Sequence, residues 1–368
     1  MSDFKRLYKN IDKVLLLLPL AFAGISLVMV SSTASQNGFV MTRDVMVQGI
    51  AYILGYIIIA VLLFFDYRIF RVFDKLLYAL SIAFLLSVYI PGLGIEQFGS
   101  RAWIDLKLTT LQPSEFVKIS FVILLASYLS KHAKGLTELK EILKALLFSA
   151  PLILIVLKED LGSALVFMFI WLVMVYFAGI SHKWLGIGLA CGAAALPGIY
   201  LLLDPYQKNR ILAFLHPEDL SLPGNYQVWQ SKVAIGSGGV FGKGLFKGTQ
   251  KALKFLPVQK SDFIFAVIVE ELGAVGGMAV IALYAFFISR FVRITRDSQD
   301  LFAALISVGF MAMFIFQIFE NIAMTMGLMP VTGITLPLIS YGGSSVLSSM
   351  IAIGVVLNIS MRSKTLNF

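Results

Sequence analysis

Long uninterrupted apolar runs constrain this chain more than any other feature of its sequence. Of its 368 residues, 58% are hydrophobic and only 14% are charged, whereas a soluble domain has about a quarter charged residues. A helix needs roughly 20 apolar residues to cross a bilayer. We predict an all-α membrane protein in which residues 1–368 form one polytopic domain. Its ten transmembrane helices are expected near residues 14–31, 45–65, 75–91, 114–130, 144–158, 161–180, 184–203, 263–289, 301–325 and 336–360.

The placement of basic residues predicts the orientation of these helices. Lysine and arginine concentrate in the short segments between alternate spans, such as 66–75 and 290–296, and are sparse in the opposite short segments. Because short basic segments stay in the cytoplasm, both termini are expected there. The long segment 204–260 has eight basic residues but falls outside, as a large extracellular loop between helices 7 and 8. The net charge of +9 reflects mainly this pattern, and without a soluble basic domain no nucleic-acid partner is expected.

Asp262 is the residue most suited to chemistry. It stands alone in the run 255–266, where the long polar loop meets an apolar segment. A bare charge is expensive to bury at such a border, so a carboxylate there points to function before structure. Glu270 and Glu271 follow a little over two helical turns later, which puts at least one of them on the side of Asp262. A shared proton or a bound cation is one interpretation, and a polar seam inside the bundle is the other.

Two further charged clusters lie near span ends. Glu115 and Lys118 are three residues apart, so they share a helix face and can pair. This pair either fixes helix packing or lines a substrate cavity. Asp160 opens a span after Lys158 and Glu159, where a polar turn divides one apolar stretch into two spans. Its carboxylate either caps that helix or lines the cavity.

Polar and helix-breaking residues crowd the stretch 317–349. So many breakers at membrane depth predict non-helical backbone that lines a cavity or is shielded by protein. The candidate substrate-binding residues in this stretch are Ser340, Gly342, Gly343 and Ser344. A second glycine-rich stretch, 236–244, contains Lys243 and offers free N–H groups. It either holds a phosphate or sugar or is a simple turn, and it lacks the spacing of a P-loop.

These stretches together resemble the SEDS family (shape, elongation, division and sporulation), and most closely its elongation branch. The resemblance extends over nearly the whole chain. The matching motifs are Arg101–Ile104, Gln112–Glu115, Asp160–Gly162, Ser261–Ala266 with Glu270–Gly273, and Pro330–Pro337 continuing to Ser344. One departure is Lys260-Ser261, where many members of that branch carry His-Thr, and it leaves the carboxylate of Asp262 intact.

The resemblance implies a peptidoglycan glycosyltransferase of the bacterial cytoplasmic membrane. At the outer face, such an enzyme joins lipid II units into glycan strands and releases undecaprenyl pyrophosphate. The family's essential aspartate corresponds to Asp262, its glutamate and lysine pair to Glu115 and Lys118, and its other cavity aspartate to Asp160. Members work with a class B penicillin-binding protein, a transpeptidase that crosslinks the strand. The short N-terminal segment favours cell elongation and rod shape, with the elongation machinery as partner, over a division paralogue. A sporulation paralogue stays open as an alternative.

The residues suit that chemistry independently of the resemblance. Glycosyl transfer from a lipid pyrophosphate needs a base for the acceptor hydroxyl and positive charge for the leaving group. Asp262 is the candidate general base. Arg101, Lys118, Arg210 and loop lysines such as Lys243 are candidates to hold the pyrophosphate. No cofactor is certain, but a divalent cation, Mg²⁺ or Mn²⁺, can serve too, with Asp262, Glu270 and Glu271 as candidate ligands.

A lipid II flippase is the alternative function. Broken helices and buried charges suit alternating access. A flippase, however, needs polar cavity residues toward both membrane faces, whereas the polar stretches here gather mostly at the outer ends of the spans. A scaffold that only recruits the transpeptidase leaves Asp262 unexplained.

Overall fold

The computed structural model is mostly helical and describes residues 8, 10–97, 100–105, 107, 110–132, 138–252, 255 and 257–363. Its elements are α2 (Lys13–Ala34), α3 (Arg43–Phe64), α4 (Ile69–Val72), α5 (Asp74–Leu86), the 3-10 helix η1 (Ser87–Tyr89), β1 (Gly94–Gln97), β2 (Ser100–Asp105), β3 (Thr110–Leu111), α6 (Pro113–His132), α7 (Leu139–Glu159), α8 (Leu161–Phe177), α9 (His182–Leu202), α10 (Pro205–Leu215), α11 (Asn225–Gly238), α12 (Thr249–Ala252), α13 (Ile264–Asp297), α14 (Leu301–Thr325) and α15 (Gly343–Ser363). The three strands pair antiparallel in the order β1-β2-β3.

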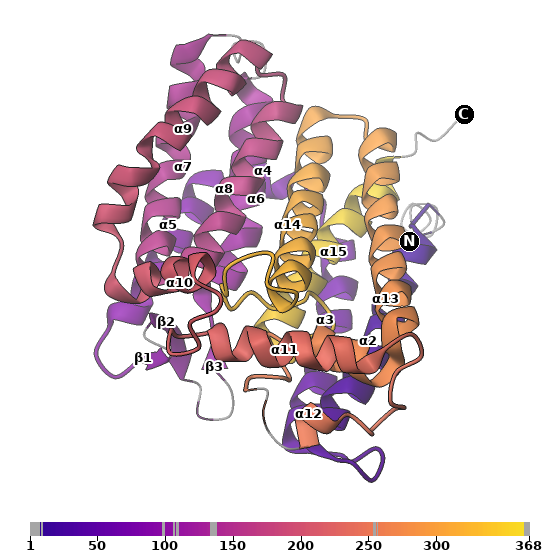
Figure 1. The fold of residues 1–368 in the computed structure, drawn as a ribbon. Coiled ribbons are helices and arrows are strands. Elements are labelled where there is room, and N and C mark those ends of the chain that lie inside the picture. Colours follow the sequence, from indigo (N-terminus) through magenta and orange to yellow (C-terminus); the bar gives the residue numbers. More distant parts are fainter. Residues whose placement is uncertain are drawn as a thin grey trace.

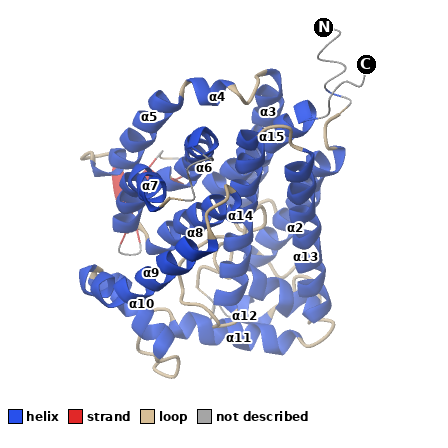
Figure 2. Ribbon diagram, turned by 90° about the horizontal axis from the view of Figure 1, so that it is seen from above, coloured by secondary structure: helices blue, strands red, loops and turns tan. Residues whose placement is uncertain are grey.

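The long helices stand side by side, and the molecule has two distinct ends (Figure 1). At one end lie the start of α2 and the last turns of α13 and α15, and we call it the terminal end. The opposite end holds α10, α11, α12 and the small sheet, and we call it the loop end. Viewed along the bundle, α14 occupies a central position (Figure 2), and it packs on α6, α8 and α13.

Within the described residues, six helices are long and apolar enough to cross a membrane, namely α2, α3, α6, α13, α14 and α15, and α8 is a shorter apolar helix. A helix overlaps each of the ten predicted stretches, but four boundaries were wrong by five residues or more, the first being that α7 begins at Leu139. α5 ends at Leu86 and gives way to η1, α13 continues to Asp297, and α15 begins only at Gly343. Residues 336–342, predicted as the start of the last span, are not helical.

The non-helical segment 326–342, between α14 and α15, runs inside the bundle. Pro330 and Pro337 cannot donate a backbone hydrogen bond, and Gly327 and Gly333 have φ angles of 73° and 75°. Four consecutive carbonyls of the segment are nevertheless satisfied by side chains of other helices. Tyr284 donates to Pro337, Tyr52 to Leu338, Ser26 to Ile339 at 2.8 Å, and Gln48 to Ser340 at 2.9 Å. Irregular backbone is thus tolerated inside the bundle because side chains make the hydrogen bonds that water would make at the surface.

Aromatic side chains fill the core between α13 and α14. The rings of Phe287, Phe291 and Phe314 are fully buried and meet edge to face, with centroids 5.0–5.5 Å apart. Such pairs contribute about 0.5–1.5 kcal/mol beyond the area that they bury. They hold the second half of α13 against the central helix.

α13 is broken at Gly273, and a loop from the loop end fills the break. Gly273 has φ 71° and ψ −173° inside the helix. The peptide groups freed by the break bond to residues 239–244: Ala274 N–H donates to Gly239 at 2.9 Å, and Lys243 N–H donates to the Glu270 carbonyl at 3.0 Å. The packing is close, since a Cβ on Gly273 would lie 2.3 Å from the carbonyl oxygen of Val240. The glycines therefore let two backbones touch.

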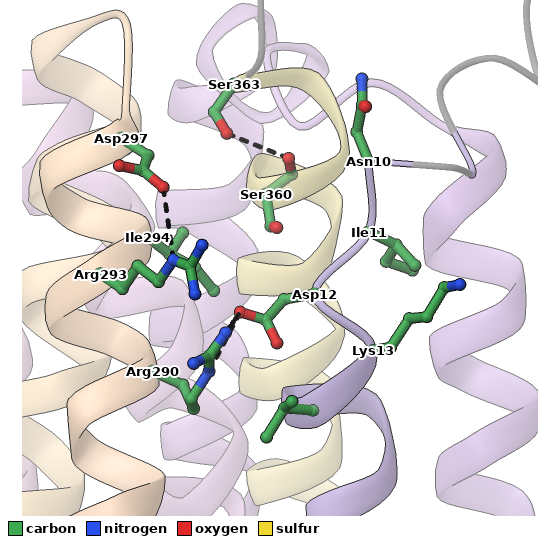
Figure 3. A pocket seen from close by; sticks show the side chains of 11 residues that line it. Asn10, Ile11, Asp12, Lys13, Arg290, Arg293, Ile294, Asp297, Ser360 and Ser363 are labelled. Carbon is green, nitrogen blue, oxygen red and sulfur yellow. Dashed lines mark hydrogen bonds and ion pairs between the residues drawn. The ribbon is translucent and has the colours of Figure 1, made fainter.

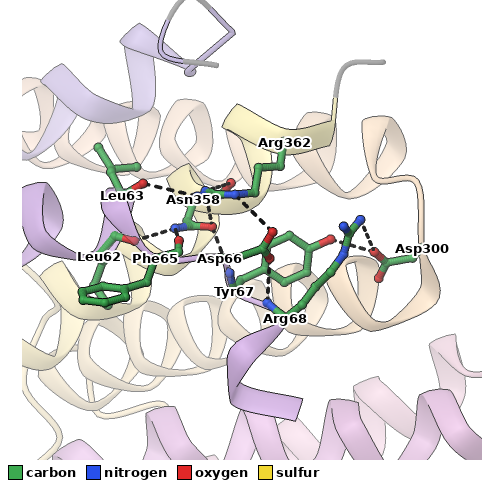
Figure 4. A network of polar contacts seen from close by, with 9 residues as sticks. All are labelled: Leu62, Leu63, Phe65, Asp66, Tyr67, Arg68, Asp300, Asn358 and Arg362. Atoms are coloured by element: carbon green, nitrogen blue, oxygen red, sulfur yellow. Dashed lines mark hydrogen bonds and ion pairs between the residues drawn. The ribbon is translucent and has the colours of Figure 1, made fainter. Parts of the chain in front are cut away.

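Two polar clusters hold the terminal end together. Asp12 caps α2 by accepting from Leu15 N–H at 3.0 Å and also binds Arg290 of α13 at 2.5 Å, beside a cavity of about 160 Å³ (Figure 3). In the second cluster, Asn358 of α15 donates to the carbonyls of Leu62 and Phe65 at 2.5 and 2.6 Å, which ties α15 to the end of α3 (Figure 4). The candidate site residues meet at the other end of the bundle, the loop end.

We expect Gly273→Ala to lower the thermal unfolding midpoint of the purified protein. A non-glycine residue at this φ costs about 1–3 kcal/mol, and the contact with Val240 adds to that cost. Gly186→Ala in α9 is the control, because a Cβ there meets nothing within 4 Å and alanine favours a helix. Equal midpoints for the two variants would show that the docked loop does not depend on the break.

Candidate active site

Asp262 lies at the loop end, two residues before α13 begins at Ile264. A tight turn presents it: the N–H groups of Ser261 and Asp262 both donate to the Val258 carbonyl at 3.2 Å. The neighbouring 326–342 segment holds the turn in place, since Tyr341 N–H donates to the Lys260 carbonyl at 2.9 Å and the Ser340 hydroxyl donates to the Ser261 carbonyl. The carboxylate is thus held on a hydrogen-bonded turn at the loop end of the bundle.

Three groups from distant parts of the chain surround the Asp262 carboxylate. Asp160 begins α8 and Arg210 lies on α10, and both act on it electrostatically. Gly333 lies between the carboxylate and Arg210, because a Cβ built on it would be 3.7 Å from Asp262 Oδ2 and 3.9 Å from the Arg210 guanidinium. The Asp262 carboxylate and the Arg210 guanidinium therefore both face one small gap, which a side chain at position 333 would fill.

The electrostatic environment makes Asp262 a better base than an ordinary aspartate. Burial raises the pKa of its carboxyl to about 6, a hydrogen bond from Ser261 and the charge of Arg210 oppose the rise, and Asp160 adds to it. A carboxylate with this pKa is ionised at neutral pH and still accepts a proton readily, which is the tuning expected of a general base.

Arg210 is held ready beside this carboxylate. Its guanidinium donates to the Tyr206 hydroxyl one turn earlier and lies 4.5 Å from the centroid of the Tyr206 ring. α10 itself begins with a capping box formed by Asp204 and Gln207, and Gln207 donates to the Leu157 carbonyl at 3.0 Å. The arginine thus belongs to a helix anchored on α7, and its charge has a fixed place.

Asp160 takes the capping role that its sequence left open, and its charge also reaches the candidate base. Its carboxylate caps α8 by accepting from the N–H groups of Gly162 and Ser163 at 3.1 and 3.0 Å. It also acts on Asp262 and Tyr206 through its charge. The N-terminus of α8 packs directly on the 326–342 segment, where a Cβ on Gly162 would lie 2.8 Å from the Thr332 carbonyl.

Glu115 and Lys118 form the buried ion pair that their spacing predicts. Lys118 Nζ is 2.5 Å from Glu115 Oε1, and their side chains are only 1% and 10% exposed. Ser348 of α15 donates to the second Glu115 oxygen at 3.0 Å. The pair joins α6 to α15, which makes it a packing element of the helices behind the site.

Other predicted residues are drawn into the framework. Lys243 binds Glu270 at 2.8 Å and Thr249 at 2.6 Å, so its ammonium is committed to α13 and not to a ligand beside Asp262. Ser340 accepts from Leu336 N–H at 2.9 Å as well as holding Ser261. Arg101 lies exposed on β2, where its charge acts on Tyr89.

The start of α15 is likewise occupied by contacts within the protein. Gly342 N–H donates to Gln48 at 3.1 Å. Ser344 donates to the Thr110 carbonyl at 3.4 Å and accepts from Gln112 N–H at 3.3 Å. Gly343 is the first residue of α15. These groups support the wall of the site from behind.

The cation ligands suggested by the sequence do not come together. Glu270 Oε1 binds Lys243 and also accepts from the N–H groups of Thr249 and Gln250, at 2.7 and 2.9 Å. The Glu271 carboxylate accepts from the Ser32 hydroxyl at 2.6 and 2.8 Å and from Phe246 N–H at 3.0 Å. Within the described residues, no group of three or more His, Cys, Asp or Glu side chains is placed to hold a metal ion. Asp262, Glu270 and Glu271 therefore do not fit a shared Mg²⁺ or Mn²⁺ site.

Sequence reasoning missed residues that complete the site. Gly333 and Tyr206 were not selected, although one shapes the gap and the other orients Arg210. Asn321 lies inside a predicted span, and its amide donates to the Asp262 carbonyl at 2.8 Å. The available signal was the pair Glu320-Asn321, two polar residues inside an otherwise apolar helix.

The fold and the site define a class: a multi-pass membrane protein that presents a carboxylate and an arginine across a gap at one end of its bundle. Residues 12–365 match the model of the cell cycle protein family FtsW, RodA and SpoVE. Stage V sporulation protein E of Bacillus subtilis (strain 168) is 37% identical over 366 residues, covering 96% of this chain and 98% of that protein. The peptidoglycan glycosyltransferase MrdB of Escherichia coli (strain K12) is 33% identical over 359 residues, covering 97% and 95%.

Solved structures agree with these sequence matches. A chain from a peptidoglycan synthase complex, in a structure concerned with the coordination of polymerization and crosslinking, is 28% identical with a TM-score of 0.82, over 96% of this chain and 98% of that one. The rod shape determining protein RodA of Thermus thermophilus gives a TM-score of 0.69 at 28% identity, over 95% and 96%. The chain therefore belongs to the FtsW, RodA and SpoVE family, the SEDS family of membrane peptidoglycan glycosyltransferases.

We expect Lys118→Met to destabilise the protein strongly. Removing one partner of a buried pair leaves the other charge unpaired and costs about 3–5 kcal/mol. Lys144→Met is a matched control, since Lys144 and Glu141 have the same i,i+3 spacing and a 2.6 Å contact, but the lysine is 50% exposed, and exposed pairs contribute little. Thermal unfolding in detergent measures both variants. A midpoint for Lys118→Met equal to that of Lys144→Met would contradict a structural role for the buried pair.

Proposed function

We propose that this protein polymerises lipid II into glycan strands at the outer face of the bacterial cytoplasmic membrane, with Asp262 as the general base. The observation that carries the proposal is that the Asp262 carboxylate and the Arg210 guanidinium lie on either side of the gap at Gly333. Support comes from the peptidoglycan glycosyltransferases among its relatives. The proposal includes a bundle of ten membrane-spanning helices with cytoplasmic termini, so that the loop end faces outward.

The two charges suit the two halves of a glycosyl transfer. Asp262 takes the proton of the 4-hydroxyl of the acceptor GlcNAc, whose oxygen forms the new bond to C1 of the donor sugar. The bond from that carbon to the pyrophosphate oxygen breaks, and undecaprenyl pyrophosphate leaves with its electron pair. Arg210 stands where negative charge of the leaving group develops, and a fixed cation in a partly desolvated site lowers the barrier more than one in water.

The gap at Gly333 gives this mechanism its geometry. A general base must lie within about 2.6–3.2 Å of the atom that it deprotonates. A point in van der Waals contact with both Asp262 and Arg210 is suited to a hydroxyl that approaches the carboxylate and an anion that approaches the guanidinium. Tyr206 holds Arg210 and Asp160 caps the adjacent helix, so the reacting groups need little reorganisation.

The proposed partner is a class B penicillin-binding protein, the transpeptidase that crosslinks the strand. Support comes from the match to a chain of a peptidoglycan synthase complex. We assign the pathway to cell elongation on the match to RodA. Complementation of strains depleted of their elongation, division or sporulation paralogue tests this assignment, and growth restored only in the division or sporulation strain would refute it.

Substitution of Asp262 tests the proposal directly. We expect Asp262→Asn and Asp262→Ala to reduce polymerisation of labelled lipid II by about 10²–10⁴-fold, the usual contribution of general base catalysis. Asp297→Asn at the terminal end is the control, because that carboxylate is half exposed and makes only a 3.9 Å contact with Arg293. The wild type and the control are expected to produce glycan strands at equal rates. Normal polymer from Asp262→Ala, or transbilayer movement of lipid II without polymer in the wild type, would overturn the proposal.

The reaction rate should depend on pH through the same group. Because the pKa of Asp262 is raised to about 6 and the base works only when ionised, we expect kcat to rise about tenfold per pH unit below 6 and to level off above it. Measurements of kcat between about pH 4.5 and 8 show the step in the wild type, and its absence from the residual activity of Asp262→Asn assigns it. A wild-type profile that is flat from about pH 5 to 7 excludes Asp262 as the titrating base.

A further inference from the structure

Asn321 makes the closest structural connection to the backbone of Asp262. It lies on α14, its side chain is fully buried, and its amide nitrogen donates to the carbonyls of Asp262 and Ile334, each at 2.8 Å. A carboxamide nitrogen carries two hydrogens, and both are used here. Since the two partners are carbonyl oxygens, only this orientation of the amide satisfies them. One side chain therefore joins the residue proposed as the base to the segment that forms the opposite wall of its gap.

The residue before it, Glu320, holds the same segment one step further along. Its side chain is fully buried, and Oε1 accepts from the Thr332 hydroxyl at 3.0 Å. Gly333 lies between Thr332, held by Glu320, and Ile334, held by Asn321. The two adjacent polar residues of α14 thus fix both neighbours of the glycine that separates Asp262 from Arg210.

These contacts make the width of the gap depend on α14. Asp262 is attached to Asn321 by its carbonyl, and Gly333 is held on both sides by the same helix. α14 is also the central helix of the bundle and packs on α6, α8 and α13 (Figure 2). A rigid element that bears both sides of a reactive gap is the arrangement that near-attack geometry requires.

The alternative is that Asn321 and Glu320 only satisfy buried backbone, as Asn358 does at the terminal end. Asn358 likewise donates to two carbonyls, those of Leu62 and Phe65, and is 3% exposed. Asn358 also accepts through its Oδ1 from Tyr67 N–H at 3.2 Å and from Arg362 at 2.7 Å, whereas Asn321 Oδ1 has no hydrogen-bond partner among the described residues. The difference that bears on the reaction lies in what the carbonyls belong to. Those held by Asn358 belong to the end of α3, whereas one of those held by Asn321 belongs to Asp262 itself.

We propose that Asn321, supported by Glu320, is a positioning residue for glycosyl transfer: it sets the place of the Asp262 carboxylate relative to Gly333 and Arg210. This inference rests on the proposed function. Asn321 touches no reacting atom in this mechanism and acts through the Asp262 backbone, so its loss should impair the chemical step more than substrate binding. Misplacement of a catalytic group by about 1 Å can cost about 10²-fold in rate.

The test compares Asn321→Ala with Asn358→Ala in the full-length protein, assayed with labelled lipid II and the cognate transpeptidase. Each variant removes one buried amide that bridges two carbonyls. Asn358→Ala also removes the acceptor of Tyr67 N–H and Arg362, so its loss of thermal stability should be at least as large as that of Asn321→Ala. We expect kcat per folded molecule to fall about 10²-fold in Asn321→Ala, with KM for lipid II changed by less than about threefold. For Asn358→Ala we expect kcat close to that of the wild type. Equal losses of kcat in the two variants, or a loss confined to KM, would refute a positioning role.

Two further variants separate hydrogen bonding from packing. Asn321→Asp keeps the shape of the side chain but offers no donor to the two carbonyls, so it should lose as much kcat as Asn321→Ala. Glu320→Gln keeps an acceptor for Thr332 and should retain wild-type kcat, whereas Glu320→Ala should not. Full activity in Asn321→Asp would show that the two hydrogen bonds are dispensable, and it also decides the matter should Asn321→Ala fail to fold.

Asp262→Asn, measured in the same assay, separates this inference from the function on which it rests. A wild type that makes no polymer, or an active Asp262→Asn, contradicts the proposed function. An active wild type with an inactive Asp262→Asn and an unimpaired Asn321→Ala leaves the function standing and contradicts only the positioning role.

Discussion

The architecture depends on satisfying a stretch of peptide that leaves the helix inside the bundle. Four consecutive carbonyls of the 326–342 segment accept hydrogen bonds from Tyr284, Tyr52, Ser26 and Gln48. An unsatisfied peptide group costs several kcal/mol where water is excluded, so the segment can be irregular only because α2, α3 and α13 supply these donors. Because the segment is not helical, it can pass beside the turn that carries Asp262.

The break in α13 follows the same rule by a different means. Gly273 interrupts the helix, and the carbonyls and N–H groups that it frees bond to the backbone of residues 239–244, with Glu270 and Glu271 fastening the loop on the same side. In the glycine-rich stretch 236–244, the N–H groups of Lys243 and Gly244 donate to α13, and those of Gly239 and Gly242 donate within the stretch. The charges of Glu270 and Lys243 pair with each other and hold this segment on α13.

What remains at the loop end is a small set of uncommitted charges. The Asp262 carboxylate and the Arg210 guanidinium face each other across Gly333 and do not form an ion pair, whereas Glu115 with Lys118 and Glu270 with Lys243 are paired at 2.5 and 2.8 Å. Asp262 and Arg210 are each half-buried, and a carboxylate kept beside a cation with which it does not pair is typical of a functional site. This contrast between paired and unpaired charges distinguishes the candidate catalytic group from the structural ones.

The sequence by itself predicted the membrane environment of this protein and its candidate catalytic residue. Apolar run lengths predicted helices at all ten positions, and a lone carboxylate at the border of an apolar segment identified Asp262, because both are local properties of the chain. The tertiary structure alone decided which polar groups meet. Ser26 and Ile339 are 313 residues apart, and Asn321 reaches Asp262 across 59 residues, so no local pattern reveals them. It also decided that Lys243, Glu270 and Glu271 make contacts within the framework. The sequence could not show this, because a charged side chain gives the same local pattern whether its partner is a ligand or another helix.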